Sequence, residues 1–305
     1  MMTKSLKLIK WAGLLISALI VLAVSFYAYL VLSFDDQNLP ENHGKVNTEL
    51  FLGSGENQPL IVGLGGSEGG NAWASDFWKG QRDEFIAQGY SFLAVAYFGE
   101  KGTPENLDRI ALESVHQAIR EAGKNPKVNG ECTALIGGSK GAELALLLGS
   151  QYADIDAVVA IVPGNAVFPA LTIAMNTPSF TLNGKDLPFV PVPSSATWPL
   201  IKGDLRATWE EMLKDQKAVD RASIAVEKIN GPILFVSATK DEAWPSTEMS
   251  ISMEQRLRKN EFPYYFEHIA IEGRHTSPLD HFGEVEEFLR TNFLQGKSVG
   301  CLKSS

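Results

Sequence analysis

Cysteine is scarce in this sequence, which has only Cys132 and Cys301 among its 305 residues. There is no Cys-x-x-Cys pair and no cluster of histidine and cysteine at the spacing of a zinc site. Neither a zinc module nor a dithiol redox centre is therefore expected. A disulfide between the two cysteines is compatible with the sequence but not required by it. We expect two unpaired thiols, with Cys132 in the hydrophobic core.

Positive charge is also scarce, because 27 Lys and Arg stand against 36 Asp and Glu and give a net charge of −9. Proteins bind nucleic acid largely by neutralising its phosphates with Lys and Arg. We therefore expect no nucleic-acid partner. The hydrophobic content of 45% and the charged content of 21% are ordinary for a globular protein with a sizeable core.

The first 34 residues stand apart because they contain a long uncharged run. Three lysines precede this run, which extends from Trp11 to Phe34 and supplies the roughly 20 apolar residues of a membrane-spanning helix. Lysines stay preferentially on the cytoplasmic side. We predict a cytoplasmic start and a single-pass transmembrane signal anchor over residues 1–34, with the remaining chain on the periplasmic or cell-surface side. A signal peptide cleaved near Ala23 and Ser25 is the alternative.

Continuous apolar runs alternate with helix-like segments from Pro59 onward. Such runs are typical of strands that are covered on both faces, and the alternation predicts a mostly parallel, doubly wound α/β sheet. The strands that we expect lie at residues 59–66, 91–98, 133–137, 157–164, 231–239 and 264–271.

The same patterns predict the domain organisation. Residues 35–58 are polar and suggest a linker, residues 59–295 form one α/β domain, and residues 296–305 form a polar tail. Residues 165–230 interrupt the alternation, being rich in proline at first and helical near 206–220. We expect a lid-like insertion there, and a folded surface excursion without substrate contact is the alternative.

A glycine-rich corner separates the strand at 133–137 from the helix-like segment that follows it. The sequence Gly-Gly-Ser-Lys-Gly at 137–141 matches the G-x-S-x-G pattern, in the strand–turn–helix context that a nucleophile elbow needs. Ser139 is therefore the candidate nucleophile, and the backbone N–H of Lys140 is a candidate oxyanion donor at a helix N-terminus. We expect the Lys140 side chain to be solvated. A structural turn with an incidental serine is the alternative.

An acid and a histidine follow the serine, each at the end of a predicted strand. Asp241 follows the strand at 231–239 and His275 follows the strand at 264–271, which is the chain order of an α/β-hydrolase triad. Glu242 is the competing acid and His281 the competing base. We predict an α/β-hydrolase fold with Ser139, Asp241 and His275 as its catalytic triad.

The loop after the first strand supplies the second expected oxyanion donor. Its sequence, "GLGGSEGGN" at 63–71, occupies the position from which hydrolases of this fold direct a backbone N–H at the nucleophile. Gly66 and Ser67 are the candidates. A phosphate-binding loop is the rival interpretation, but Glu68 stands where G-x-G-x-x-G requires its third glycine. No acidic residue ends a second strand about 20 residues later, as ribose binding would need.

Four segments together resemble a known family. They are "GGSKGAELAL" (137–146), "GKDLPFVPVP" (184–193), "GPILFVSATKDEAWPS" (231–246) and "IEGRH" (271–275). They are similar to the C-terminal catalytic domain shared by acyl-CoA thioester hydrolases and bile acid-CoA:amino acid N-acyltransferases. The resemblance runs over about residues 59–293 and maps the family's nucleophile, acid and base onto Ser139, Asp241 and His275. We expect no counterpart of the family's N-terminal β-sandwich.

The resemblance implies a serine hydrolase that cleaves acyl thioesters such as acyl-CoA, or related esters, without a metal or an organic cofactor. Acyltransferase members of the family typically carry cysteine at the nucleophile, so Ser139 favours hydrolysis. The family points to long acyl chains, and we expect Phe168 and Phe180 to line an acyl pocket. An acyltransferase or peptidase with the same triad, and a non-catalytic membrane-tethered binding module, are the alternatives.

Overall fold

The structure is a computed structural model that describes residues 4–295 and Cys301, with side chains from Ile9 onward. The first three residues of the predicted cytoplasmic start lie outside the described residues. So does the predicted polar tail at 296–305, apart from Cys301.

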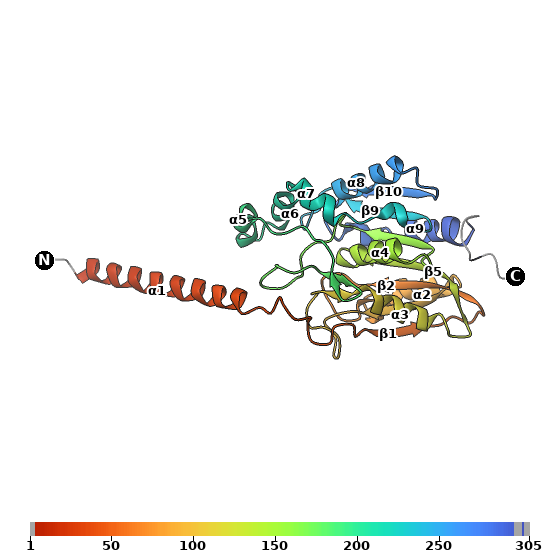
Figure 1. The fold of residues 1–305 in the computed structure, drawn as a ribbon, viewed down its shortest axis with the longest axis horizontal. Coiled ribbons are helices and arrows are strands. Elements are labelled where there is room, and N and C mark those ends of the chain that lie inside the picture. The colour runs from red at the N-terminus through yellow and green to blue at the C-terminus, as the bar shows by residue number, and fades with distance from the viewer. Residues whose placement is uncertain (1–3, 296–300, 302–305) are drawn as a thin grey trace.

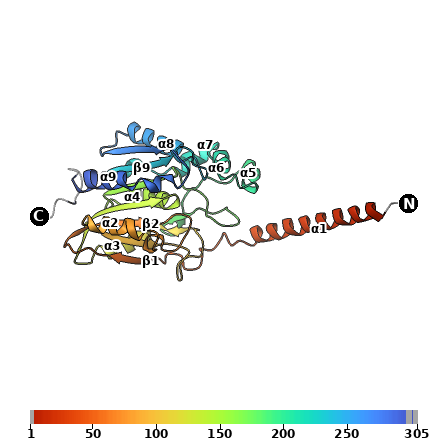
Figure 2. The ribbon, with the colours of Figure 1, turned by 180° about the vertical axis from the view of Figure 1, so that it is seen from behind.

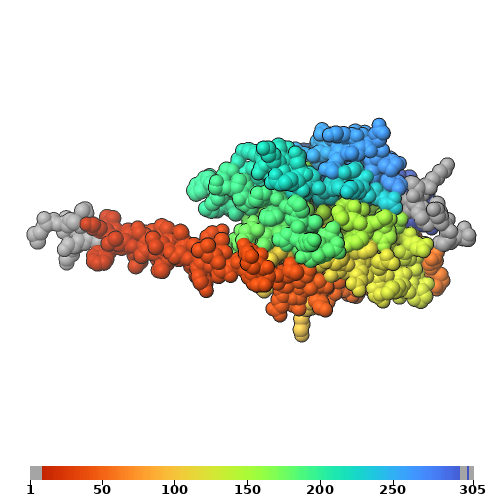
Figure 3. Space-filling model, viewed as in Figure 1, coloured from red at the N-terminus to blue at the C-terminus, as the bar shows by residue number. Residues whose placement is uncertain are grey.

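An apolar helix, α1 (Lys4–Leu32), extends from one end of a rounded body that holds the rest of the described chain (Figure 1). The space-filling view shows the same separation from the body (Figure 3). The segment Ile9–Leu32 has a mean hydropathy of 2.5, and none of it is buried. By length and composition this helix could cross a membrane, and a signal sequence has the same features.

The body is built on a seven-stranded sheet with the order β1-β3-β2-β5-β6-β9-β10. Only β1 is antiparallel to its neighbour, so the sheet is mostly parallel, as the alternating pattern predicted. The strands are β1 (Asn47–Phe51), β2 (Gln58–Leu64), β3 (Ser91–Ala96), β5 (Val128–Gly138), β6 (Ala157–Ile161), β9 (Ile233–Ala238) and β10 (Phe266–Ile271). Every residue of β3, β6 and β9 is buried, which explains their continuous apolar sequences.

Helices cover both faces of this sheet (Figure 2). Along β2, Leu60 and Val62 pack into the core under one face, whereas Ile61 packs into the core under the other. The first face is covered by α3 (Leu112–Ala122), α4 (Lys140–Gln151) and α8 (Ser246–Lys259), and the second by α2 (Lys79–Ala87) and α9 (Phe282–Phe288). Two hydrophobic cores therefore hold the sheet between helical layers.

Residues 165–230 fold into a small unit at the end of the body from which α1 leaves (Figure 1). A second sheet of order β4-β7-β8 ties this unit to the chain before α3. Its elements are β4 (Ile110–Ala111), β7 (Phe180–Leu182), β8 (Lys185–Asp186), α5 (Thr197–Ile201), α6 (Leu205–Leu213) and α7 (Gln216–Ala222). The short helices of the whole body are η1 (Ala72–Ala74), η2 (Ser194–Ala196), η3 (Val226–Lys228), η4 (Ser277–Asp280) and η5 (Leu289–Leu294).

The segment at 35–58 is more ordered than a linker. It contains β1, which forms the antiparallel edge of the main sheet, and the Arg109 guanidinium donates hydrogen bonds to the carbonyl oxygens of Asp35 and Asp36. The exposed half of β1 carries polar residues, because an edge strand buries little of its surface. That polarity makes its sequence look like a linker.

The expectation of two unpaired thiols is wrong, because Cys132 and Cys301 form a disulfide. Cys132 lies in β5 and is fully buried, as expected for a core residue. The two residues are 169 positions apart in the chain, and the fold alone brings them together. The bond attaches the end of the chain to the central part of the sheet.

Candidate active site

Ser139 stands at the sharp turn between β5 and α4, with a positive φ of 54°. A non-glycine residue in this conformation is strained. Its N–H donates a hydrogen bond of 2.8 Å to the carbonyl oxygen of Ile161 in the neighbouring strand β6. The flanking glycines are required sterically: a Cβ on Gly137 would lie 2.1 Å from the carbonyl oxygen of Gly141, and one on Gly141 would lie 2.4 Å from that of Gly65. The turn therefore holds the serine side chain at the carboxyl edge of the sheet.

Asp241 and His275 are held together at the same edge. The His275 Nδ1 lies 2.8 and 2.9 Å from the two carboxylate oxygens of Asp241. Asp241 is 1% exposed, and its carboxylate also accepts hydrogen bonds from the Ser246 hydroxyl at 2.6 Å and from the N–H groups of Ala243 and Trp244. Burial raises the pKa of Asp241, but the hydrogen bonds from His275 and Ser246 outweigh it and bring that pKa below its usual value. The carboxylate is therefore ionised and oriented.

The competing acid and base have other partners. Glu242 accepts a hydrogen bond from the backbone N–H of His275 at 3.0 Å and pairs with Arg274. His281 is the N-cap residue of α9, and its Nδ1 lies 3.4 Å from the Glu284 carboxylate. Neither His281 nor Glu242 lines the pocket that contains Ser139 and His275.

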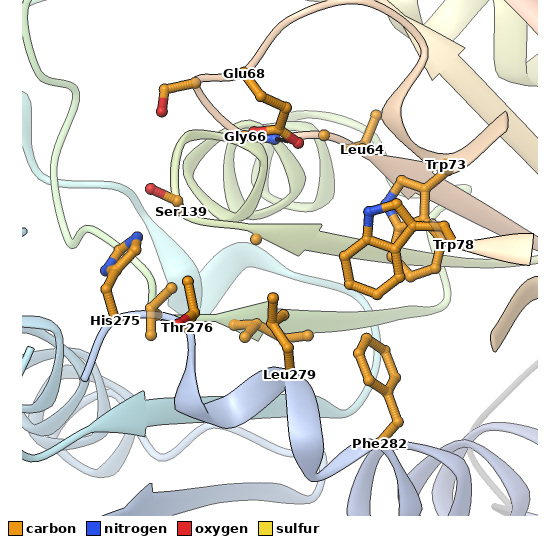
Figure 4. A pocket seen from close by; sticks show the side chains of 15 residues that line it. Leu64, Gly66, Glu68, Trp73, Trp78, Ser139, His275, Thr276, Leu279 and Phe282 are labelled. Carbon is orange, nitrogen blue, oxygen red and sulfur yellow. Dashed lines mark hydrogen bonds between the residues drawn. The ribbon is translucent and has the colours of Figure 1, made fainter. Parts of the chain in front are cut away.

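Ser139 and His275 line the same pocket, at one end of it (Figure 4). Within the described part of the chain, no hydrogen bond joins the Ser139 hydroxyl to the imidazole, so the serine is not engaged with the histidine in this conformation. Hydrogen bonds of this kind are often long in ligand-free sites and form when substrate binds.

The two candidate donors of the oxyanion loop differ in their surroundings. The backbone N–H of Gly66 donates to the Glu68 carboxylate at 2.9 Å. A Cβ built on Gly66 would lie 3.4 Å from the Cβ of Ser139, so this backbone approaches the serine closely. Ser67 is exposed and lines the same pocket. The N–H of Lys140 begins α4 directly after Ser139, where the helix dipole favours negative charge.

The side chain of Lys140 is buried, so the expectation of a solvated lysine is wrong. It is 2% exposed, and its Nζ lies 2.7 Å from Glu143, which is fully buried. Glu143 also accepts a hydrogen bond from the backbone N–H of Phe168 at 3.0 Å. Burial lowers the pKa of Lys140 and raises that of Glu143, and the opposite charge of each partner limits both shifts. The insertion covers this helix start, which the local sequence does not reveal.

The predicted acyl-pocket residues, Phe168 and Phe180, do not line the pocket of Ser139. Both are fully buried, Phe168 against Trp209 and Trp244, and Phe180 in the core under α3 and α4. Phe168 thus packs within the insertion, and Phe180 packs the insertion onto the main body. The pocket walls come instead from η1, the segment before α2, η4 and α9.

Sequence reasoning missed several residues around the site. Glu68, Trp73 and Trp78 line the pocket, and Ser246 binds the carboxylate of Asp241. Val162 has a positive φ of 43° and lines the pocket, and its carbonyl oxygen accepts a hydrogen bond from the Trp244 indole. Strain at a β-branched residue is unusual and concentrates at functional sites. Only the close spacing of Trp73 and Trp78 after the oxyanion loop offered a signal.

Comparison with known proteins identifies the family of the chain. A family model described as "BAAT / Acyl-CoA thioester hydrolase C terminal" matches residues 110–274, more than half of the chain. The match includes Ser139 and Asp241 and ends one residue before His275.

Curated relatives agree with this family. Acyl-coenzyme A thioesterase 6 of Mus musculus is 33% identical over 214 residues, covering 69% of this chain and 46% of that protein. Acyl-coenzyme A amino acid N-acyltransferase 1 of Mus musculus is 26% identical over 220 residues, covering 71% and 48%. The chain therefore spans about half the length of the curated relatives it matches.

A solved structure supports the fold. An alpha/beta hydrolase from Penicillium sp. sh18 superposes with a TM-score of 0.50 at 15% identity, covering 81% of this chain and 96% of that one. The predicted α/β-hydrolase fold is thereby confirmed.

Proposed function

Because the chain belongs to the BAAT / acyl-CoA thioester hydrolase C-terminal family, we propose that it is a serine hydrolase that cleaves acyl thioesters or related esters. Ser139 is the nucleophile, His275 the general base and Asp241 the residue that orients His275. The observation that carries this proposal is the pairing of the His275 Nδ1 with both oxygens of a buried Asp241, at the mouth of the pocket that Ser139 lines. Such a pairing fixes the tautomer, leaving Nε2 free to accept a proton.

The first chemical step is attack of the Ser139 oxygen on the acyl carbonyl carbon. The serine proton passes to His275 Nε2, and Asp241 stabilises the imidazolium that results. The negative charge that develops on the carbonyl oxygen is held by the N–H of Lys140 and by that of Gly66 or Ser67. Each such donor accounts for roughly 10²–10³ in kcat in comparable enzymes.

The second step releases the acyl group. The bond from the acyl carbon to the leaving group breaks, His275 transfers its proton to the departing thiolate or alkoxide, and an acyl-Ser139 ester remains. A water molecule then attacks this ester while His275 accepts its proton, so that a carboxylic acid is released and the serine is restored. No metal or organic cofactor takes part.

The proposed setting is the outer face of a membrane. The apolar segment Ile9–Leu32 would anchor the protein, and the disulfide between Cys132 and Cys301 would suit an oxidising compartment outside the cytoplasm. A cleaved signal sequence would lead to the same compartment.

Active-site labelling tests the proposal. The full chain in detergent is treated with a fluorophosphonate probe, which reacts with activated serines, and the labelled peptide is identified by mass spectrometry. We expect labelling at Ser139, no labelling of Ser139→Ala, and hydrolysis of short acyl thioesters and esters. A well-folded protein that is neither labelled nor active would overturn the assignment of an enzyme. Amide formation in the presence of an amino acid would identify an acyltransferase.

A further inference from the structure

The pocket of Ser139 continues away from the serine to an end walled by aromatic rings. Trp73, Trp78 and Phe282 form this wall, with Leu279 beside it (Figure 4). The rings of Trp73 and Trp78 stack with centroids 4.4 Å apart, and Phe282 meets them edge-on at 6.1 and 5.5 Å. Interlocked rings of this kind form a wall that yields little.

The sheet also supports the wall from behind. Trp73 is 3% exposed and packs against Gly63 of β2, where an added Cβ would lie 2.5 Å from the indole. Because the Trp73 indole lies so close to the backbone, the aromatic wall has no room to move toward the sheet. The depth of the pocket is therefore set by the fold.

The space that remains is small, because the whole cavity measures about 170 Å³. An engineered apolar cavity of about 150 Å³ holds one benzene molecule. A chain of about six carbons, or one aromatic ring, is therefore the largest group that fits. A long acyl chain would have to leave through the open side.

The aromatic end carries no charged group among the pocket residues that the structure describes. Of the ionisable side chains of the pocket, His275 lies beside Ser139, and the Glu68 carboxylate is held by the backbone N–H of Gly66 in the oxyanion loop. A carboxylate at the far end of an acyl group would lose its water there and find no partner, which is costly. Acyl groups that end in a charge should therefore be rejected.

We propose that this aromatic-walled pocket is the acyl-binding site and that it selects compact, uncharged acyl groups, from about butanoyl to hexanoyl or benzoyl. This inference rests on the proposed serine hydrolase function. It replaces the long-chain preference suggested by family resemblance and moves the acyl pocket from the insertion to the region around η1 and α9. The leaving group then lies on the side of Ser67 and Glu68, which are exposed to solvent.

A series of p-nitrophenyl esters measures the selection directly. The full chain, at one fixed detergent concentration, is assayed with acetate, butyrate, hexanoate, decanoate and benzoate esters. We expect kcat/KM for butyrate, hexanoate and benzoate to exceed that for decanoate at least tenfold. Values that keep rising through decanoate would overturn the inference while leaving the hydrolase function intact.

Pocket variants connect the selection to the named wall. Leu279→Trp fills the cavity, so it should lower kcat/KM for hexanoate and benzoate at least tenfold and that for acetate less than threefold. Leu279→Ala should raise decanoate relative to butyrate. Leu213→Ala, at a half-buried leucine of α6 outside the pocket, is the matched control and should leave the order of substrates unchanged. Equal losses on every ester in Leu279→Trp would place the acyl group elsewhere.

Binding separates this inference from the proposed chemistry. Calorimetric titration of Ser139→Ala with benzamide, hexanamide and octanamide needs no turnover. We expect octanamide to bind at least tenfold more weakly than hexanamide, and Leu279→Trp to abolish binding of benzamide. If the unmodified protein shows no esterase activity, this binding pattern would still support the pocket but would reject the hydrolase function. Tighter binding of octanamide would reject the pocket.

Discussion

The carboxylate of Glu68 accepts a hydrogen bond of 2.9 Å from the backbone N–H of Gly66, so a side chain of the oxyanion loop already occupies one of its two candidate donors. A substrate carbonyl that uses the Gly66 N–H must displace this carboxylate. The hydrogen bond between Glu68 and Gly66 therefore offers a way to test whether Gly66 or Ser67 is the oxyanion donor.

Removing the Glu68 carboxylate should free the donor. If Gly66 supplies the oxyanion contact, Glu68→Ala should raise kcat/KM about three- to tenfold, since hydrogen bonds to charged acceptors are the stronger ones. Glu68→Gln, which keeps an acceptor oxygen, should change it less. Steady-state kinetics on p-nitrophenyl butyrate measure both variants. Values within twofold of the unmodified protein for Glu68→Ala would assign the donor to Ser67.

Loss of the serine hydroxyl should remove nearly all turnover. Ser139→Ala should fold normally and retain no more than about 10³–10⁴-fold acceleration over water. This is the residual acceleration that the oxyanion hole and substrate binding provide in such enzymes. His275→Ala should be similarly damaging. His281→Ala is the matched control and should stay within a few-fold of the parent. A larger loss in His281→Ala than in His275→Ala would mean that the base had been assigned wrongly.

Asp156 should make the stability of the fold depend on pH. It is 8% exposed, and burial raises its pKa to about 6 although its carboxylate accepts a hydrogen bond from the Thr133 N–H. The folded state therefore binds the Asp156 proton more tightly than the unfolded state, and this contribution to stability is lost as pH rises from about 4 to 6. Two pKa units correspond to about 3 kcal/mol.

Asp156→Asn tests this dependence. The free energy of unfolding of the variant, measured by urea titration, should increase relative to the parent by about 2–3 kcal/mol between pH 4 and pH 7. The informative quantity is the pH dependence of the difference in free energy of unfolding between variant and parent, because the other carboxylates titrate equally in both proteins. A difference that stays constant across this range would show that Asp156 has an ordinary pKa.

The disulfide between Cys132 and Cys301 should contribute to stability, because it closes a loop of 169 residues. Reduction, or Cys301→Ser, should lower the free energy of unfolding by about 2–5 kcal/mol. Denaturant unfolding with and without reductant measures the loss, and reductant should have no effect on Cys301→Ser. Reaction of the untreated, unfolded protein with a thiol reagent at both cysteines would contradict the bond.

The orientation of the chain is tested by reporter fusion. If the lysines before Trp11 keep the N-terminus in the cytoplasm, as we propose, alkaline phosphatase joined after Asp35 should be active. The membrane-bound protein should keep its first residues on N-terminal sequencing. A fluorescent cytoplasmic reporter that works better at the same position would reverse the topology, and a mature start near Phe26 would indicate a cleaved signal peptide.

Local patterns predicted the framework well. The strands around Ser139, Asp241 and His275 end within a residue or two of their expected positions, because apolar runs and turn residues mark them locally. Residues 72–88 do not form one helix, since the chain leaves η1 through an extended Ser75 before α2 begins at Lys79. The helix α3 begins at Leu112, because Ile110 and Ala111 before it pair with β7.

Contacts between distant segments explain what the sequence could not reveal. The pocket wall joins Trp73 and Trp78 to Phe282, about 200 positions later, and no local pattern connects them. Phe168 and Phe180 were equally apolar candidates, but Phe168 is buried in the core of the insertion and Phe180 in the main core under one face of the sheet. Apolarity predicts burial, whereas only the fold decides whether a buried ring meets a cavity or another side chain.

The buried pair of Lys140 and Glu143 limits how the protein can move. Glu143 receives the N–H of Phe168, so the first residues of the insertion are fastened to the helix that carries Ser139. Moving the insertion as one unit would break the hydrogen bond from Phe168 to the buried Glu143. It would also displace the turn that holds the serine. The fewest such constraints apply to α5, where Trp198 and Ile201 are 63% and 69% exposed. The base of the insertion is thus fixed to the helix that follows the nucleophile.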